Sequence, residues 1–146
     1  MVKPGILLDS NVLSELRKGR KADPHVRQWA GKWSPEQLYT SVICMMEIRT
    51  GVYAALRKNP DFGILLQEWY ENKLKPAFRH RVLPVDLATA EMTALLQTQR
   101  TLPFRDGLIA ATAKTGGFPI ATRNTKDFIG LGVDLINPWK EDQSNF

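Results

Sequence analysis

Short apolar runs alternate along the chain with longer stretches in which apolar residues recur every three or four positions. The short runs are typical of buried strands, and the longer stretches are typical of helices with one apolar face. A chain in which strands alternate with helices is expected to form a parallel sheet with helices on both faces. The five predicted strands are 6–8, 38–41, 81–85, 119–122 and 133–136.

Capping residues and prolines give the boundaries of the helices between these strands. Asp23 followed by Pro24 combines a helix cap with a first-turn proline, Gly116 and Gly117 are a typical helix stop, and Pro84 predicts an edge position for the third strand. The expected apolar faces are Leu13 and Leu16; Val26, Trp29, Ala30 and Trp33; Met45, Ile48, Val52 and Ala55; Phe62, Leu65, Leu66 and Trp69; and Ala88, Met92, Leu95 and Leu96. The helix of Met45 is expected to end near Asn59 and Pro60, and the helix of Phe62 to be capped by Asp61 and to end before Pro76. The helix of Ala88 is expected to start at Asp86 or Thr89, and an alanine-rich helix is expected over 106–114.

The length of 146 residues favours one domain, which we assign to residues 1–140, with a polar tail over 141–146. We expect a three-layer α/β/α fold around a central parallel sheet of five strands. The single cysteine, Cys44, excludes a disulfide framework within the chain and a zinc site built from several cysteines. No apolar stretch approaches the roughly 18 residues of a membrane span, and the first apolar run is too short for a signal peptide. We therefore expect a cytoplasmic protein with no membrane attachment.

Polar residues follow several of the predicted strands. Asp9 follows the first strand, Glu47 lies early in the helix after the second, and Asp106 opens the alanine-rich helix; Asn124 and Asp127 follow the fourth strand. In open parallel sheets, ligands bind outside the carboxyl ends of the strands. Each residue also has a simpler interpretation, because aspartates often cap helices or occupy turns and glutamates on helices are usually solvated.

Taken together, these acids favour a metal site. Carboxylates gathered at one sheet edge repel each other, and a divalent cation compensates that repulsion. Oxygen ligands suit Mg²⁺ or Mn²⁺ better than zinc. Such an ion polarises a phosphoryl oxygen and activates water, so the acids favour hydrolysis of a phosphodiester. His25 and His80 are far in sequence from the acids, and we do not expect them to be catalytic.

Five sequence runs occur in this order along the chain: LLDSNVLSEL (7–16), MEIRTGV (46–52), RDGLIAATA (105–113), ATRNTKDF (121–128) and GVDLINPW (132–139). In this ordered set the chain resembles the PIN domain of VapC- and FitB-type toxins of type II toxin–antitoxin systems. The resemblance covers nearly the whole chain and implies an endoribonuclease that depends on Mg²⁺ or Mn²⁺.

The resemblance also implies roles for individual residues. Asp9, Glu47 and Asp106 match the metal-binding acids, and Thr122 matches a polar residue that lines the site. The fourth acidic position of the family falls on Asn124, so that either Asn124 or Asp127 completes the catalytic set and the number of metals is open. Asn11, two residues after Asp9, is predicted to orient a metal ligand or a water molecule.

The net charge of +5 favours a polyanionic partner. Arg49, Arg105 and Arg123 lie within a few residues of the acids and are predicted to contact RNA phosphates, although most arginines simply form a solvated surface. The resemblance implies a homodimer, a cognate antitoxin, and contact with DNA only through that antitoxin. The helix pair over 48–69 is a candidate for an apolar groove that binds an antitoxin segment.

Two other functions compete with the nuclease. A regulatory, nucleic-acid-binding subunit with a degenerate PIN site, acting in a DNA-bound complex with its antitoxin, is supported by the amide at Asn124. A phosphotransfer or phosphatase domain would require an aspartate two residues after Asp9, where this chain has Asn11. Trp29, Trp33 and Trp69 stand at core spacing and are predicted to pack rather than to stack on bases.

Overall fold

The computed structural model describes residues 5–140, so the predicted polar tail lies outside the described residues. Its strands form one parallel sheet in the order β3-β2-β1-β4-β5. The strands are β1 (Ile6–Leu8), β2 (Leu38–Ser41), β3 (Val82–Leu83), β4 (Ile120–Ala121) and β5 (Leu135–Ile136). The edge position predicted for the third strand from Pro84 is confirmed, and β1 lies at the centre.

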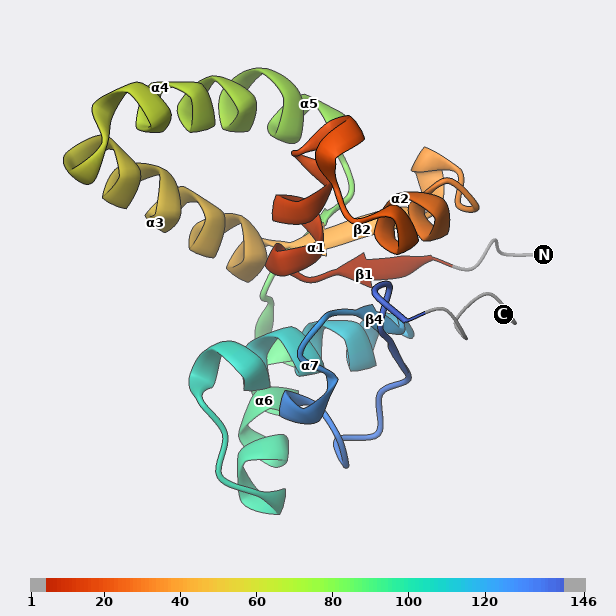
Figure 1. The fold of residues 1–146 in the computed structure, drawn as a ribbon. Helices are drawn as coiled ribbons and strands as arrows, with labels where there is room; N and C mark the ends of the chain where they lie inside the picture. Colours follow the sequence, from red (N-terminus) through yellow and green to blue (C-terminus); the bar gives the residue numbers. More distant parts are fainter. Residues whose placement is uncertain (1–4, 141–146) are drawn as a thin grey trace.

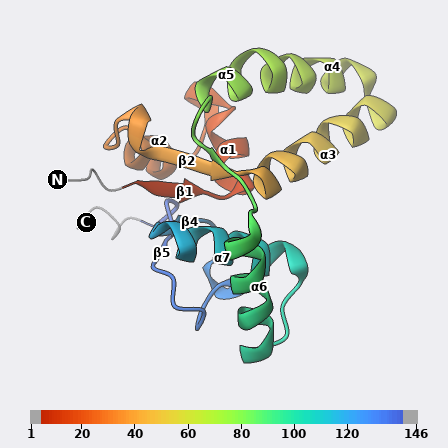
Figure 2. The same ribbon diagram turned by 180° about the vertical axis from the view of Figure 1, so that it is seen from behind.

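Helices cover both faces of this sheet, which confirms the three-layer α/β/α prediction (Figure 1). One layer holds α1 (Ser10–Leu16), α2 (Pro24–Ala30), α3 (Val42–Lys58), α4 (Pro60–Trp69) and α5 (Lys75–Ala77). The other layer holds α6 (Leu87–Gln99) and α7 (Phe104–Gly116). The view from behind shows how the chain passes from α5 through β3 to α6 (Figure 2). Short 3₁₀ turns lie at Gly19–Lys21, Pro35–Gln37 and Thr125–Asp127, and a π-helical segment at Tyr70–Leu74.

The alternation of side chains along the strands divides the core into two clusters. Ile6 and Leu8 of β1 pack with α1, α2 and α3 on one face of the sheet. Leu7 of the same strand points to the other face and packs with α6 and α7, as does Ile120 of β4. The residues of β1 are completely buried, as expected for a central strand covered on both sides.

Two predicted helix boundaries are wrong. The cap of α4 is Asn59, whose side chain accepts a hydrogen bond from the Phe62 amide at 3.4 Å, and not Asp61, which lies in the first turn. The helical conformation also does not end before Pro76, because it continues through the π-helical segment into α5. Pro76 lies in α5 directly after the π-helical segment, and its missing N–H leaves a gap in the backbone hydrogen bonds at that junction.

The predicted apolar faces of two helices also differ from the structure. In α4, Phe62 and Leu65 are 41% and 64% exposed, and Gly63 is the buried residue. In α6, Leu95 is 51% exposed, whereas Thr89, Thr93 and Leu96 are buried. The buried faces of both helices carry small residues, because these faces press closely against the neighbouring helices α3 and α7.

The remaining helices agree with their predicted patterns. Trp29 is buried in the first core cluster, and Trp33 and Trp69 pack against it, which confirms that these rings are packing residues. None of the helices within residues 5–140 is long and apolar enough to cross a membrane.

Candidate active site

Three acidic side chains meet at the carboxyl end of the sheet. Asp9 directly follows β1 and caps α1, since its Oδ1 accepts a hydrogen bond from the Ser10 amide at 2.8 Å. Glu47 lies in the second turn of α3, which begins directly after β2, the neighbour of β1. Asp106 lies in the first turn of α7. Asp9 and Asp106 are buried, at 0% and 8% exposure, which is unusual for carboxylates without a partner.

The partner that these three acids share is Arg105. Its Nη2 donates to Asp9 Oδ1 at 2.7 Å and to Glu47 Oε1 at 2.8 Å, its Nη1 donates to Asp106 Oδ1 at 2.7 Å, and its Nε donates to Glu47 Oε2. One guanidinium therefore compensates three carboxylates, and the cluster retains two negative charges. Arg105, which we predicted to contact RNA phosphates, lies inside the acidic cluster, with its side chain 29% exposed.

A chain of hydrogen bonds fixes the second oxygen of Asp9 to the end of β4. Asp9 Oδ2 accepts from the Thr122 hydroxyl at 2.8 Å. The Thr122 oxygen in turn accepts from the side-chain amide of Asn11 at 3.2 Å and from the backbone amide of Asn124 at 3.1 Å. The Asn11 carbonyl oxygen accepts from the backbone amide of Arg123 at 3.2 Å. Asn11 and Thr122 thus hold Asp9 in place, as residues that orient a ligand are expected to do.

Two residues at the cluster were not predicted from the sequence. The Ser10 hydroxyl donates to Glu47 Oε1 and accepts from Arg105 Nη2 at 3.3 Å. Cys44 is buried, with its sulfur 3.8 Å from Asp9 Oδ1. The one signal in the sequence for Ser10 is its position immediately after Asp9.

Burial and the shared guanidinium act against each other on the ionisation of these groups. Burial alone would raise the pKa of Glu47, but hydrogen bonds from Arg105 and Ser10 outweigh it and hold that pKa below its ordinary value. Burial prevails at Asp106 and raises its pKa, with Asp127 and Asp9 adding to the increase against the opposing effect of Arg105. Burial would lower the pKa of Arg105, yet the carboxylates raise it overall, so that Arg105 stays charged.

The structure keeps the remaining predicted residues outside this hydrogen-bonded cluster. Asn124 is exposed and reaches the cluster through its backbone, whereas Asp127 is partly buried and near enough to Asp106 to affect its pKa. Arg49 pairs with Glu71 at 3.3 Å. Arg123 is exposed, with its guanidinium 5.2 Å from the centre of the Trp139 ring.

The donor set suits a hard cation, but its present arrangement does not receive one. Asp9, Glu47 and Asp106 offer only oxygen atoms, which Mg²⁺ and Mn²⁺ prefer. Within residues 5–140, however, no group of three histidine, cysteine, aspartate or glutamate side chains is spaced to hold a metal ion. The Arg105 guanidinium stands between the three carboxylates and uses the same oxygens. The residues therefore fit a divalent metal in kind and in charge, provided that Arg105 withdraws.

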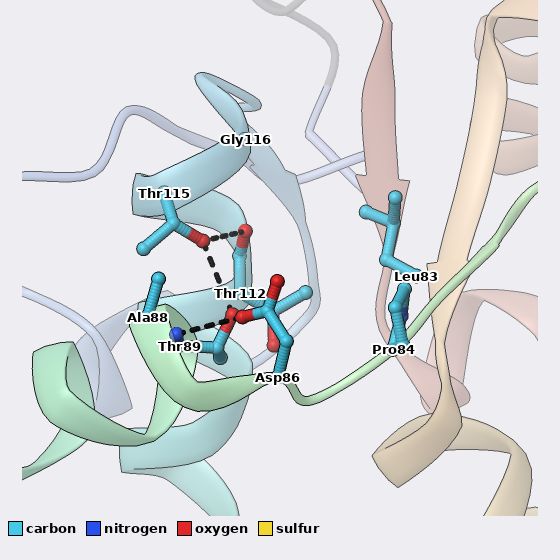
Figure 3. Close-up of a pocket in the computed structure, with 8 residues that line it drawn as sticks. All are labelled: Leu83, Pro84, Asp86, Ala88, Thr89, Thr112, Thr115 and Gly116. Atoms are coloured by element: carbon cyan, nitrogen blue, oxygen red, sulfur yellow. Dashed lines mark hydrogen bonds between the residues drawn. The ribbon is translucent and has the colours of Figure 1, made fainter.

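A separate pocket of about 270 Å³ lies between the end of β3, the start of α6 and the end of α7 (Figure 3). Its polar groups bond to one another: Asp86 accepts from the Thr89 amide at 2.9 Å, and the hydroxyls of Thr89 and Thr115 are 3.4 Å apart. None of the eight residues that line it is basic. The pocket therefore offers a ligand few free hydrogen bonds, and the acidic cluster is the stronger candidate site.

Comparison with known proteins identifies the family of this chain. The model of the PIN domain family matches residues 6–131. A VapC ribonuclease of Sinorhizobium fredii is 40% identical over 140 residues, which cover 92% of this chain and 98% of that protein. Toxin FitB of Neisseria gonorrhoeae is 35% identical over 141 residues, which cover 93% and 99%.

Solved structures give the same result. The structure of FitAB bound to a DNA fragment matches with a TM-score of 0.83 and 35% identity, covering 92% of this chain and 96% of that one. A toxin–antitoxin complex from Klebsiella pneumoniae matches with a TM-score of 0.68 and 26% identity, covering 93% and 99%. On the fold, the order of the acidic residues and these matches, the chain belongs to the PIN-domain family, as a protein of the VapC and FitB type.

Proposed function

We propose that this protein is a metal-dependent endoribonuclease and the toxin of a toxin–antitoxin pair. The observation that carries the proposal is the convergence of three carboxylates from β1, α3 and α7 on one cation. Two of these carboxylates, Asp9 and Asp106, are buried. The three carboxylates and Arg105 together still carry a net negative charge. Relatives named VapC ribonuclease and toxin FitB support the assignment. Acting on RNA, such a protein would work in the cytoplasm.

Asp9, Glu47 and Asp106 would hold Mg²⁺ or Mn²⁺, with Asn124 or Asp127 completing the set. When bound, the ion would polarise the phosphoryl oxygen and lower the pKa of a water molecule for attack on phosphorus. Phosphoryl transfer needs little covalent chemistry from the protein, which agrees with a cluster whose nucleophiles are a hydrogen-bonded serine, Ser10, and a buried thiol, Cys44.

The chain's own residues then act by positioning. Thr122 and the Ser10 amide each donate a hydrogen bond to one oxygen of Asp9. This carboxylate would therefore keep its orientation when a metal ion replaces the Arg105 guanidinium. The exposed guanidinium of Arg123, which adjoins Thr122, would bind a phosphate of the RNA backbone. Arg49 is engaged by Glu71 and contributes less to RNA binding.

An antitoxin is the proposed protein partner, because a matched structure is a toxin–antitoxin complex. The hairpin of α3 and α4 projects from the sheet (Figure 1). Several of its large apolar side chains are exposed. We call the following set the hairpin surface: Tyr53, Phe62, Ile64 and Leu65, which are 55%, 41%, 51% and 64% exposed. Large apolar side chains that stay exposed are typical of protein interfaces, and an antitoxin helix or strand would cover some of them. A homodimer remains part of the proposal.

The test is hydrolysis of RNA by the purified protein, freed of antitoxin, with Mg²⁺ or Mn²⁺ and with EDTA. We expect cleavage with the metals and none with EDTA. Asp9→Asn, Glu47→Gln and Asp106→Asn should each lower the rate roughly a hundredfold or more, since each removes a charged metal ligand. Glu71→Gln is the matched control, because it removes a carboxylate that pairs with Arg49 and Lys75 outside the cluster. Undiminished cleavage by Asp106→Asn would contradict the proposal.

The second candidate is a regulatory subunit with a degenerate site, acting in a DNA-bound complex. Two features of the chain favour this function: Asn124 stands where the family has an acid, and the Arg105 guanidinium already occupies the acidic cluster. A matched structure, that of FitAB, is also a complex bound to DNA. In that case the purified protein would not cleave RNA at any metal concentration, while its complex with the antitoxin would retain DNA binding.

A further inference from the structure

We propose that Arg105 is a built-in competitor for the metal site, so that a divalent ion binds only after the Arg105 guanidinium has left the carboxylates. This inference rests on the proposed metal site at Asp9, Glu47 and Asp106. It assigns Arg105 a role that neither the fold nor the order of the acidic residues requires.

The first argument is that the guanidinium and an ion need the same atoms. Arg105 donates to Asp9 Oδ1, to Asp106 Oδ1 and to both oxygens of Glu47. Mg²⁺ binds oxygens at about 2.0–2.1 Å in an octahedral shell, so it would lie where the guanidinium now lies. Two positive groups in that space would also repel each other. The two states therefore exclude each other.

The second argument is that the cluster attracts a stronger cation than Arg105. Three carboxylates and one guanidinium sum to two negative charges, whereas three carboxylates and a divalent ion sum to one. Burial of Asp9 and Asp106 makes the excess charge costly. An ion with twice the charge of Arg105 relieves more of this cost, so the exchange is driven by the charge of the cluster itself.

The third argument is that Arg105 has a route out. It lies in the first turn of α7, and its side chain is 29% exposed although it is bound by three acids. The flanking Phe104 is 75% exposed. Rotation of the side chain alone would carry the guanidinium into solvent, whereas Asp106, the next residue, stays buried on the same helix. The backbone does not need to move for the site to open.

The experiment compares Mn²⁺ and Mg²⁺ affinity of the wild-type protein and of Arg105→Ala by isothermal titration calorimetry, on full-length protein free of antitoxin. We expect Arg105→Ala to bind Mn²⁺ about tenfold more tightly or better, in the range of ordinary coupling between two ligands. Arg105→Lys should lie between the two, because an ammonium cannot reach three carboxylates as a planar guanidinium does. The matched control is Arg57→Gln, which removes an exposed arginine at the end of α3 and should leave the affinity unchanged.

Thermal unfolding gives a second readout that does not depend on activity. Without metal, Arg105→Ala should melt below the wild type, because its carboxylates lack a counter-ion. With saturating Mn²⁺ the two melting temperatures should become nearly equal, since the ion then takes the place of the guanidinium in the wild type and of the missing counter-ion in Arg105→Ala. A double variant, Arg105→Ala with Asp9→Asn, should lose the gained affinity, which would locate the ion at the cluster.

The outcomes separate this inference from the proposed function. Equal or weaker Mn²⁺ binding by Arg105→Ala, with measurable binding by the wild type, overturns the competition and leaves the metal site intact. Absence of binding in both proteins overturns the metal site and the competition together, and Arg105 is then a permanent structural bridge. The inference is supported only if Arg105→Ala binds Mn²⁺ more tightly than the wild type does.

Discussion

Cys44 shows how strongly a single residue's environment decides its chemistry. It is the chain's one thiol, and it lies at the start of α3, completely buried and 3.8 Å from an oxygen of Asp9. Burial raises the pKa of Cys44 to about 11, and the negative charge of Asp9 adds to the increase, against hydrogen bonds from Ser41 and Thr40. The thiolate is the nucleophilic form of cysteine, so this environment makes Cys44 inert.

We therefore expect Cys44 to resist Ellman's reagent at pH 8 in the native protein and to react rapidly once guanidinium chloride unfolds the chain. Thiol release followed by absorbance measures both rates. The control is Thr50→Cys in a Cys44→Ala background, which places the single thiol at an exposed position of the same helix. Rapid labelling of native Cys44 would show that the site opens far more often than its burial implies.

The same shift makes a prediction for alkaline pH. The ordinary thiol pKa is 9.0 and that of folded Cys44 is about 11. The folded state thus holds the thiol proton more tightly, and the resulting stabilisation is complete below pH 9 and is lost as pH rises toward 11. The melting temperature of the wild type should fall more steeply over this range than that of Cys44→Ala. Parallel curves would contradict the prediction.

At the scale of elements, the approach of α4 to α3 depends on a glycine. Gly63 is the buried residue of α4, and a Cβ atom there would lie 2.6 Å from the Leu56 Cα and 2.9 Å from the Ala55 carbonyl carbon. Real Cβ contacts essentially never come so close, and both atoms belong to the backbone. The two helices therefore reach this close approach only with glycine at this position, and a glycine, not an apolar side chain, fills the contact between them.

Gly63→Ala should destabilise the protein by about 2 kcal/mol or more, the usual cost of overpacking, because the two helices must move apart. Gly51→Ala is the matched control: it lies within α3 with no atom within 4 Å of the added methyl group. That change should stabilise the protein by about 0.5–1 kcal/mol through helix propensity. Urea unfolding of both variants measures the difference, and equal stabilities would contradict the close approach.

At the scale of the whole molecule, the candidate site and the exposed apolar residues lie on different parts of the fold. The chain carries a net charge of +5, yet the acidic cluster at the carboxyl end of the sheet has an excess of negative charge. The hairpin surface lies on helices that project from the sheet (Figure 2). In the proposed function, this arrangement would let one protein attract RNA, hold a cation and present an apolar surface to an antitoxin at separate places.

Leu65→Glu on the hairpin surface should abolish co-purification with the product of an adjoining antitoxin gene, because it buries a charge in an apolar contact. Melting of the isolated protein should change little, since Leu65 is 64% exposed. RNA cleavage by the isolated variant should also persist. The exposed Thr50→Glu, on the solvent side of α3, is the control for added charge. Unimpaired co-purification of Leu65→Glu would place the antitoxin elsewhere.

The sequence by itself determined the order of the elements, the parallel sheet and the edge strand at Pro84. These follow from local patterns, namely the period of apolar residues and the turn residues that interrupt them. It also predicted that Asp9 and Glu47 lie at one end of the sheet, because each follows a strand and the carboxyl ends of parallel strands share an edge. Asp106 follows a helix, so the packing of α7 brings it to the same place.

Only the tertiary structure decided what the acids bind and which apolar residues are covered. Nothing near Arg105 in the sequence distinguishes an arginine that contacts phosphate from one that fills the cluster, since its partners Asp9 and Glu47 are 96 and 58 residues away. Nor does the apolar stripe of α4 reveal that Phe62 and Leu65 are exposed, because that depends on Gly63 meeting a backbone in another helix. Contacts between distant segments set both outcomes, and no local pattern carries that information.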